Sequence, residues 1–207
     1  LEIIIPSNWN SKWEKTFKPI HISSDCVIRA DFHEEFGKKY EIIINPKMSF
    51  GTGHHETTMM MIEYALEISF IKKRVLDMGC GTGILSIIAS KKKACSISAI
   101  DKDPCCVENT IENSRKNSCD NINVTLTEKV NKEDGAYDLI FANINLNELL
   151  NQIPSFANVL KSNGDLLLSG FFYQDLTDLK AKCEDFGFKI INNKIKKELC
   201  AIRFKKH

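Results

Sequence analysis

An acidic residue followed by three alternating glycines is the part of this sequence best suited to binding chemistry. Asp77 follows a short apolar stretch, and Gly79, Gly81 and Gly83 come next, ahead of the glycine-free run I-L-S-I-I-A-S. Glycine at every second position lets the backbone turn tightly and approach a ligand, because no Cβ stands between them. A helix that begins after this turn points its free N–H groups at the same ligand. We therefore predict a small cofactor where a strand ends and this helix begins.

The spacing of these glycines narrows the kind of cofactor. A dinucleotide fingerprint needs a third glycine at the position that Ile84 occupies, and a P-loop needs a lysine after its glycines. Neither requirement is met. The D-M-G-C-G-T-G pattern of residues 77–83 instead resembles the first motif of class I S-adenosylmethionine (AdoMet) methyltransferases. The resemblance implies AdoMet as the cofactor, and a tight turn without a ligand is the alternative.

A second acidic residue, Asp101, ends the strand-like run S-I-S-A-I-D. It lies about twenty residues beyond the glycines, where a ribose-binding carboxylate belongs in this kind of fold. Asp103 and Pro104 already fit the N-cap and first position of the next helix. We therefore expect Asp101 to bind a ligand, with a helix-capping role as the alternative.

Asn143 is a third polar residue at the end of a strand, in the run Y-D-L-I-F-A-N-I-N. In a doubly wound sheet the site opens at the carboxyl ends of the strands. An amide oxygen there can accept an N–H from a substrate amine and so direct the lone pair of the nitrogen toward a methyl donor. An asparagine that ends a strand in a turn is the alternative.

The elements that would carry these residues alternate between strand and helix from Arg74 onward. We predict strands at 74–77, 96–101, 122–127, 137–142, 165–169, 188–197 and 199–205, and helices at 84–92, 104–117, 146–160 and 174–186. This order predicts an α/β fold with a doubly wound, seven-stranded, Rossmann-like sheet. The last two strands are too close in sequence to be parallel, so we expect them to form a C-terminal antiparallel hairpin.

The chain divides into three parts on this interpretation. Residues 1–20 form a tether, in which Trp9 and Trp13 share a helix face that docks on the core. Residues 21–46 form a small antiparallel β element, with strand-like runs at 19–22, 26–32 and 40–46. Residues 47–207 form the methyltransferase domain.

Composition indicates an ordinary soluble globular protein. Of the 207 residues, 43% are hydrophobic and 27% charged, and the formal net charge is +1, which gives no electrostatic case for binding nucleic acid. We expect the basic residues of the C-terminal hairpin to lie on its solvent side. No apolar run is long enough to span a membrane. The 8 cysteines lack C-x-x-C or zinc-like spacing, so we expect free thiols in the cytoplasm and no metal site.

The segment N-P-K-M-S-F-G-T-G-H-H-E-T-T, residues 45–58, makes the resemblance more specific. Together with D-M-G-C-G-T-G and A-N-I it strongly resembles the ribosomal protein L11 methyltransferase (PrmA) family. The resemblance covers the chain from about residue 8 to its end. It departs from the family pattern at His54-His55-Glu56, where a threonine usually precedes the histidine and a proline follows it.

The resemblance implies that AdoMet is the cofactor and that the acceptors are lysine side chains and the N-terminal amino group of ribosomal protein L11. Carried over by motif, it implies AdoMet contacts at Thr58, Gly79, Asp101 and Asn143. It also places Phe50 and the loop 51–53 over the cofactor, where Phe50 could form part of an apolar mouth that lowers the pKa of the amine. The family has a separate N-terminal recognition domain, and we expect this chain to begin after it.

Two questions stay open at this level. His54 and His55 could relay a proton or only shape the loop. The alternative functions are an N-methyltransferase for another protein or a small amine, a non-catalytic AdoMet-binding protein that docks on ribosomes, and a NAD-binding oxidoreductase.

Overall fold

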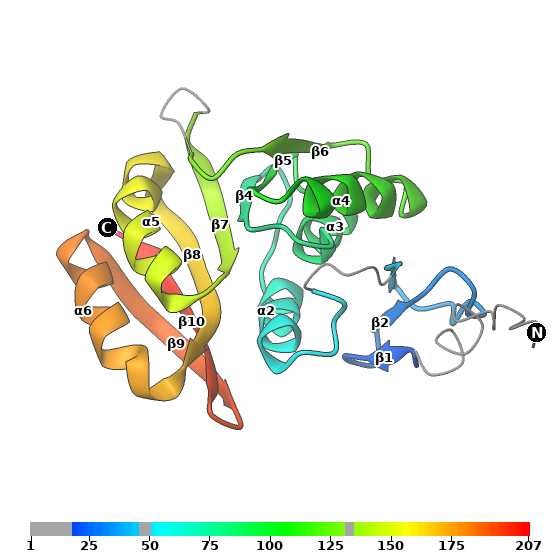
Figure 1. Ribbon diagram of the computed structural model, residues 1–207, viewed down its shortest axis with the longest axis horizontal. Coiled ribbons are helices and arrows are strands. Elements are labelled where there is room, and N and C mark those ends of the chain that lie inside the picture. The colour runs from blue at the N-terminus through cyan, green and yellow to red at the C-terminus, as the bar shows by residue number, and fades with distance from the viewer. Residues whose placement is uncertain (1–17, 46–50, 131–134) are drawn as a thin grey trace, which may run out of the picture.

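A seven-stranded sheet with helices on both faces forms the centre of the molecule (Figure 1). The computed structural model describes residues 18–45, 51–130 and 135–207. The strand order is β6-β5-β4-β7-β8-β10-β9, in which β10 runs antiparallel to both of its neighbours and all other pairs are parallel. The sheet and the helices around it comprise α2 (Glu56–Glu67), β4 (Arg74–Met78), α3 (Ile84–Lys91), β5 (Ser96–Asp101), α4 (Pro104–Lys116), β6 (Ile122–Leu126), β7 (Tyr137–Asn143), α5 (Leu146–Val159), β8 (Leu160–Phe172), η2 (Tyr173–Asp175), α6 (Leu176–Asp185), β9 (Phe188–Lys196) and β10 (Leu199–Lys206). The predicted doubly wound sheet with its C-terminal hairpin is confirmed.

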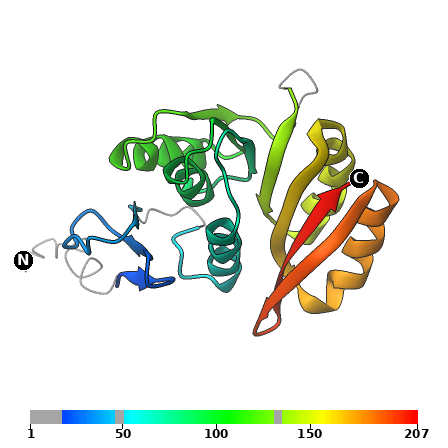
Figure 2. The same ribbon diagram turned by 180° about the vertical axis from the view of Figure 1, so that it is seen from behind.

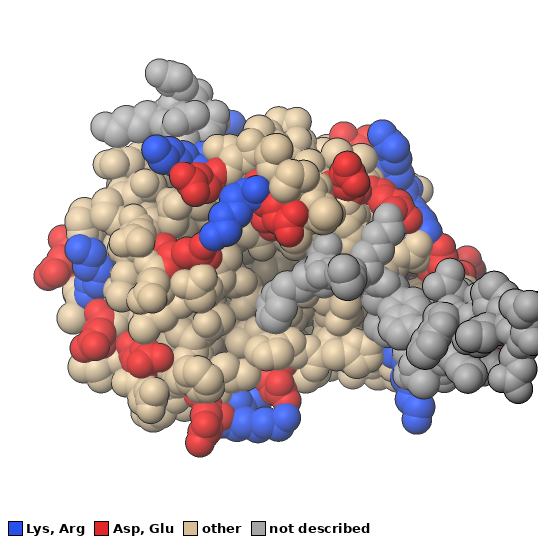
Figure 3. Space-filling view, in the orientation of Figure 1, with Lys and Arg blue, Asp and Glu red and all other residues tan. Residues whose placement is uncertain are grey.

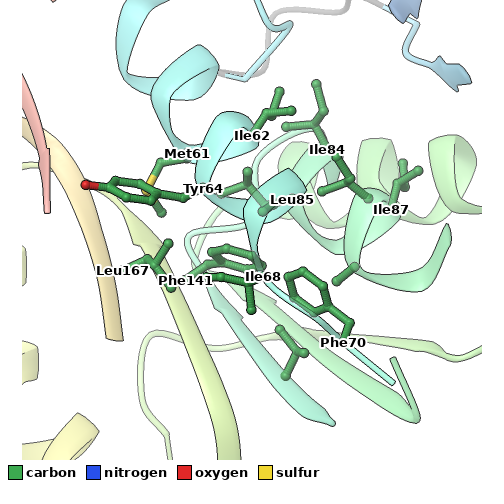
Figure 4. Close-up of a cluster of buried hydrophobic side chains, with 14 of the residues drawn as sticks. Met61, Ile62, Tyr64, Ile68, Phe70, Ile84, Leu85, Ile87, Phe141 and Leu167 are labelled. Atoms are coloured by element: carbon green, nitrogen blue, oxygen red, sulfur yellow. The ribbon is translucent and has the colours of Figure 1, made fainter. Parts of the chain in front are cut away.

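Side chains alternate along each central strand between two buried clusters, one on each face of the sheet. In β7, Leu139 and Phe141 join the cluster under α2 and α3, whereas Ile140 and Ala142 join the cluster under α5 and α6. Figures 1 and 2 show these two helix layers from opposite sides. Figure 4 shows Tyr64 of α2 packed with Phe141 and other residues of the first cluster. Because both faces of the sheet are covered, its strands are held in place from two sides.

The small N-terminal sheet differs from the prediction. It contains β1 (Ile20–His21), β2 (Cys26–Arg29) and β3 (Tyr40–Ile43). The pair β1–β2 is antiparallel, but β2 and β3 are parallel, so the expected all-antiparallel element is wrong. The connection 30–39 is long enough to return the chain to the starting end of β2, and Arg29 holds it through hydrogen bonds to the carbonyls of Ala30 (3.2 Å) and His33 (3.1 Å).

Other boundaries shift in the main sheet. β8 begins at Leu160, several residues before the predicted start at 165, and the last helix is preceded by the short 3-10 segment η2. The predicted tether and its tryptophan-bearing helix lie almost wholly outside the described residues. In the described part of the chain, no helix is both long and apolar enough to cross a membrane.

We predicted that the lysines of the β9–β10 hairpin face solvent. Three of them instead form ion pairs with glutamates of α2. Lys194 pairs with Glu67 of α2 (Nζ–Oε1 2.7 Å), and Lys196 and Lys197 pair with other glutamates of the same helix, Glu63 and Glu56. The hairpin therefore fastens α2 against the sheet, which fixes the end of the helix that reaches the candidate site.

Candidate active site

The glycine turn adopts the left-handed conformations that its sequence predicts. Gly79, Gly81 and Gly83 have φ of 71°, 56° and 79°. The Gly79 N–H donates to the carbonyl of Ile100 at the end of β5 (2.8 Å), which closes the turn against the neighbouring strand. A Cβ on Gly79 would lie 2.3 Å from Cγ2 of Ile144, so no larger residue fits here without a shift.

Asp77 lies beneath this turn rather than in an open site. Its carboxylate is 1% exposed and accepts hydrogen bonds from the Ser86 backbone N–H (3.0 Å) and hydroxyl (2.6 Å). Burial raises the pKa of Asp77 to about 6, against the opposing effect of the Ser86 hydrogen bonds. Gly83 is likewise enclosed, because a Cβ there would lie 2.8 Å from Cγ2 of Thr110. These two predicted cofactor residues thus tie β4 to the following helices.

Asp101 stands at the carboxyl end of β5, beside the turn. Its Oδ2 accepts from the Gly81 N–H (3.0 Å), and its Oδ1 accepts from the Asp103 N–H (3.0 Å). Asp103 in turn accepts from the Cys105 N–H (2.8 Å) and caps α4, as the sequence predicts. Each carboxylate oxygen retains capacity for a further hydrogen bond. Asp101 is therefore fixed in orientation and still able to accept from a ligand hydroxyl.

Asn143, at the end of β7, has a side-chain oxygen in an unusual environment. Its Nδ2 is 3.4 Å from the Thr58 hydroxyl oxygen, whereas its Oδ1 is buried and has no hydrogen-bond partner among the described residues. A buried acceptor without a partner is costly unless a ligand satisfies it. Thr58 itself is fully buried in α2. It reaches the site through Asn143 and does not line the cleft itself.

A cleft of about 870 Å³ connects these features along the carboxyl ends of the strands. Figure 3 shows the hollow in this face, with acidic and basic side chains beside it. The predicted residues on its wall are Gly79, Gly81, Asp101 and Asn143. The sequence reasoning missed the other lining residues, which include Ile100, Lys102, Cys106, Thr127, Glu128, Ile144, Asn145, Glu148, Gln152, Gly170, Phe172 and Leu199.

Several of the missed residues directly follow the ends of strands, which is the signal that could have found them. Lys102 follows β5 and forms an ion pair with Glu148 of α5, and both side chains line the cleft. Gln152 of α5 donates to the carbonyl of Glu128, which comes shortly after β6 (2.8 Å). α5 is thereby tied to the loops after β5 and β6, along the part of the cleft farthest from Phe172 and Leu199.

The two histidines of the predicted loop lie in different places. His55 lines the cleft and caps α2, with its Nδ1 3.4 Å from the Thr57 backbone N and 2.7 Å from the Thr57 hydroxyl. His54 is exposed and contacts Thr52. Phe50 lies outside the described residues. The loop after it is joined to the glycine turn, because the Thr82 hydroxyl donates to the Gly51 carbonyl (2.6 Å).

The arrangement suits a ligand that carries hydroxyl and N–H groups, because the site offers hydrogen-bond acceptors at Asp101 and Asn143. Among the described residues, no three His, Cys, Asp or Glu side chains form a group that could hold a metal. The backbone turn and the fixed carboxylate of Asp101 can hold a nucleoside, and the Asn143 amide oxygen can accept an N–H beside it. A group transfer to an amine, directed by position, fits this geometry.

Comparison with known proteins finds similarity over nearly the whole chain. The family model described as ribosomal protein L11 methyltransferase (PrmA) matches residues 2–207. The ribosomal protein L11 methyltransferase of Phocaeicola vulgatus is 43% identical over 200 residues, which cover 95% of this chain and 71% of that protein. That of Porphyromonas gingivalis is 44% identical over 200 residues, 95% of this chain and 69% of that protein. A crystal structure of ribosomal protein L11 methylase from Lactobacillus delbrueckii subsp. bulgaricus has a TM-score of 0.84 and 27% identity, and covers 92% of this chain and 100% of that one.

Proposed function

The chain belongs to the ribosomal protein L11 methyltransferase (PrmA) family, and from this membership and its cleft we propose that it methylates amines of ribosomal protein L11 with AdoMet. The amines are lysine side chains and the N-terminal amino group, on the free protein or on the ribosome. A ribosomal substrate also implies that the protein acts in the cytoplasm. The observation that carries the proposal is the buried, unpartnered Oδ1 of Asn143 beside the glycine turn.

The residues of the cleft fit AdoMet. Gly79 and Gly81 let the backbone approach the cofactor, and the fixed carboxylate of Asp101 accepts from the ribose hydroxyls. Thr58 holds the Asn143 amide through its hydroxyl. Asp77 and Gly83 support the cofactor indirectly, by shaping the turn. When bound, AdoMet supplies the electrophilic methyl of its sulfonium.

The protein contributes mainly by positioning the acceptor. The Asn143 Oδ1 accepts one N–H of the neutral amine and directs its lone pair along the line of displacement. A lysine amine has an ordinary pKa of about 10.4, and desolvation in the cleft lowers it, so no dedicated base is needed. We assign Phe50 to the apolar mouth that provides part of this desolvation. The proton released by the methylated amine leaves to solvent.

His55 serves the site chiefly as a helix cap in this proposal. Its Nδ1 faces the Thr57 backbone N–H, so a protonated ring would give up that acceptor. A proton relay through His54 has less support, because His54, unlike His55, does not line the cleft.

Mass spectrometry of purified ribosomal protein L11 after incubation with the chain and AdoMet tests the function directly. We expect methylated lysines and a methylated N-terminus. AdoMet binding by calorimetry with no methyl transferred to any protein of a ribosomal extract would instead identify a non-catalytic binding protein.

Two variants separate the roles of the site residues. Asn143→Ala should lower kcat about a hundredfold with a much smaller loss of AdoMet affinity, since it removes an acceptor-positioning group. Asp101→Asn should chiefly weaken AdoMet binding in calorimetry. Equal losses of kcat and affinity in Asn143→Ala would make Asn143 a cofactor ligand only.

A further inference from the structure

A half-exposed apolar patch borders the cleft where β8 ends. Phe172 is 50% exposed and the next residue, Tyr173, is 51% exposed. Leu199, the first residue of β10, pairs directly with Phe172 across the two strands. Both Phe172 and Leu199 line the cleft. Large apolar side chains left open at the mouth of a cleft are typical of a surface that a ligand covers.

The strand register relates this patch to the amide that receives the acceptor amine. Asn143 of β7 pairs with Ser169 of β8, and Phe172 lies three residues further along the same strand. Three residues of strand extend roughly 10 Å. Gly170 presses against the Ile144 carbonyl, so the two strands stay in contact between these points. The four-carbon stem of a lysine and the ring of Phe172 can bridge this distance together.

The charges around the patch suit a lysine-bearing acceptor. The cationic residues of the cleft wall are Lys102 and Lys129, which follow β5 and β6 on the side of the cleft opposite Phe172. Lys102 is paired with Glu148. On the side of Phe172, the described lining residues include no lysine or arginine. The Tyr173 N–H donates to the carbonyl of Glu198 (2.7 Å), which holds an acidic residue beside the patch. No cationic side chain is among the described lining residues on this side, and Lys196 and Lys197, which lie beside Leu199 in the hairpin, are paired with Glu63 and Glu56 of α2.

We propose that Phe172 and Leu199 form an acceptor lip, which holds the aliphatic stem of the lysine whose amine lies at Asn143. The ring of Phe172 contacts the methylenes, and Leu199 supports the ring from the neighbouring strand. The lip sets the affinity for the acceptor and leaves the cofactor contacts unchanged. This inference rests on the proposed transfer of a methyl group to amines.

Steady-state kinetics of Phe172→Ala with ribosomal protein L11 tests the lip. We expect KM for the acceptor to rise about tenfold, from the loss of half a phenylalanine's apolar contact. The Kd of AdoMet in calorimetry and kcat should each stay within about twofold of wild type. Phe172→Leu keeps an apolar side chain and should restore most of the affinity. Ile191→Ala is the matched control, because Ile191 is 52% exposed on β9 and does not line the cleft.

The outcomes separate the lip from the function on which it rests. An unchanged acceptor KM in a folded Phe172→Ala variant, with the wild type active, overturns the lip alone. A rise in the Kd of AdoMet that matches the rise in KM also overturns it, because the ring would then hold the cofactor. A wild type that methylates no amine overturns the proposed function and the lip together.

Discussion

Gly170 offers the sharpest test of how the strands hold the site. Its φ is +99°, and a Cβ there would lie 2.2 Å from the carbonyl oxygen of Ile144, where ordinary contact begins at 3.4 Å. The obstacle is backbone rather than a flexible side chain, so an alanine would have to push the Ile144 peptide away by about 1 Å. Because Ile144 follows Asn143, this displacement passes directly to the residue that we assign to the acceptor amine.

The expected effects of Gly170→Ala follow from the positive φ of Gly170 and from the clash with the Ile144 carbonyl. Left-handed backbone costs a non-glycine residue about 1–2 kcal/mol, and overpacking adds about 1–3 kcal/mol. We therefore expect the free energy of unfolding to fall by roughly 3 kcal/mol. A misplacement of about 1 Å in a positioning group can cost about a hundredfold in rate, so kcat should fall by about that factor.

Gly187→Ala is the matched control for backbone strain. Gly187 has a φ of +82°, and a Cβ there would meet nothing within 4 Å. This variant should lose about 1 kcal/mol of stability and keep wild-type kcat. Urea unfolding and steady-state kinetics of both variants measure the difference. A folded Gly170→Ala with wild-type turnover, or an equal loss of turnover in Gly187→Ala, would refute the argument.

Three further changes test the forces that hold the fold. Folding raises the pKa of Asp77 to about 6 from 3.8, so the contribution of Asp77 to stability should fall by about 2 kcal/mol as pH rises from 4 to 7, and urea titrations should find this part of the pH dependence nearly absent in Asp77→Asn. Burial opposes ionisation of Asp165, but Arg203 and Lys205 outweigh this effect and hold the pKa of Asp165 below its usual value. The ionised Asp165 therefore stabilises the fold at neutral pH, and this stabilisation is lost as pH falls through the folded pKa. Asp165→Asn should therefore cost about 2 kcal/mol at pH 7 and little in acid, and an equal cost at both pH values would contradict this. Lys92→Met removes hydrogen bonds to three carbonyls at the end of α2 and should lower the unfolding free energy by about 2 kcal/mol; a loss below the error of urea unfolding would contradict it.

The glycine turn and the cap of α4, which border the part of the cleft that we assign to the cofactor, could be predicted because their signals lie in short, continuous segments. The glycine turn needs only local backbone conformations, and Asp103 and Pro104 cap α4 by a local rule. The parallel strands could be predicted because apolar runs alternate with helical patterns. The burial of Asp77 also had a signal, since alternation along β4 puts it on the same face as Val75, under α3.

The direction of β3 in the small sheet and the ion pairs of the hairpin lysines could not be predicted from local patterns. The direction of β3 depends on how the connection 30–39 folds, and Arg29 fixes that connection through contacts of its guanidinium group. The lysines of the hairpin have partners on α2 that are more than a hundred residues away in sequence. Charge patterns along either segment alone look like ordinary solvated faces.

The acceptor side of the cleft depends on such long-range contacts at every point. Its wall combines the start of α2, the end of β7, the end of β8 and the start of β10, and no two of these segments are adjacent in sequence except through long connections. The hairpin that carries Leu199 also holds α2, whose Thr58 contacts Asn143. A change in the hairpin therefore reaches the acceptor amide by two routes, through β8 and through α2. The Asp101 carboxylate lies outside both routes, because the Gly81 and Asp103 N–H groups hold it, so mutations in the hairpin should change acceptor binding more than the ribose contact.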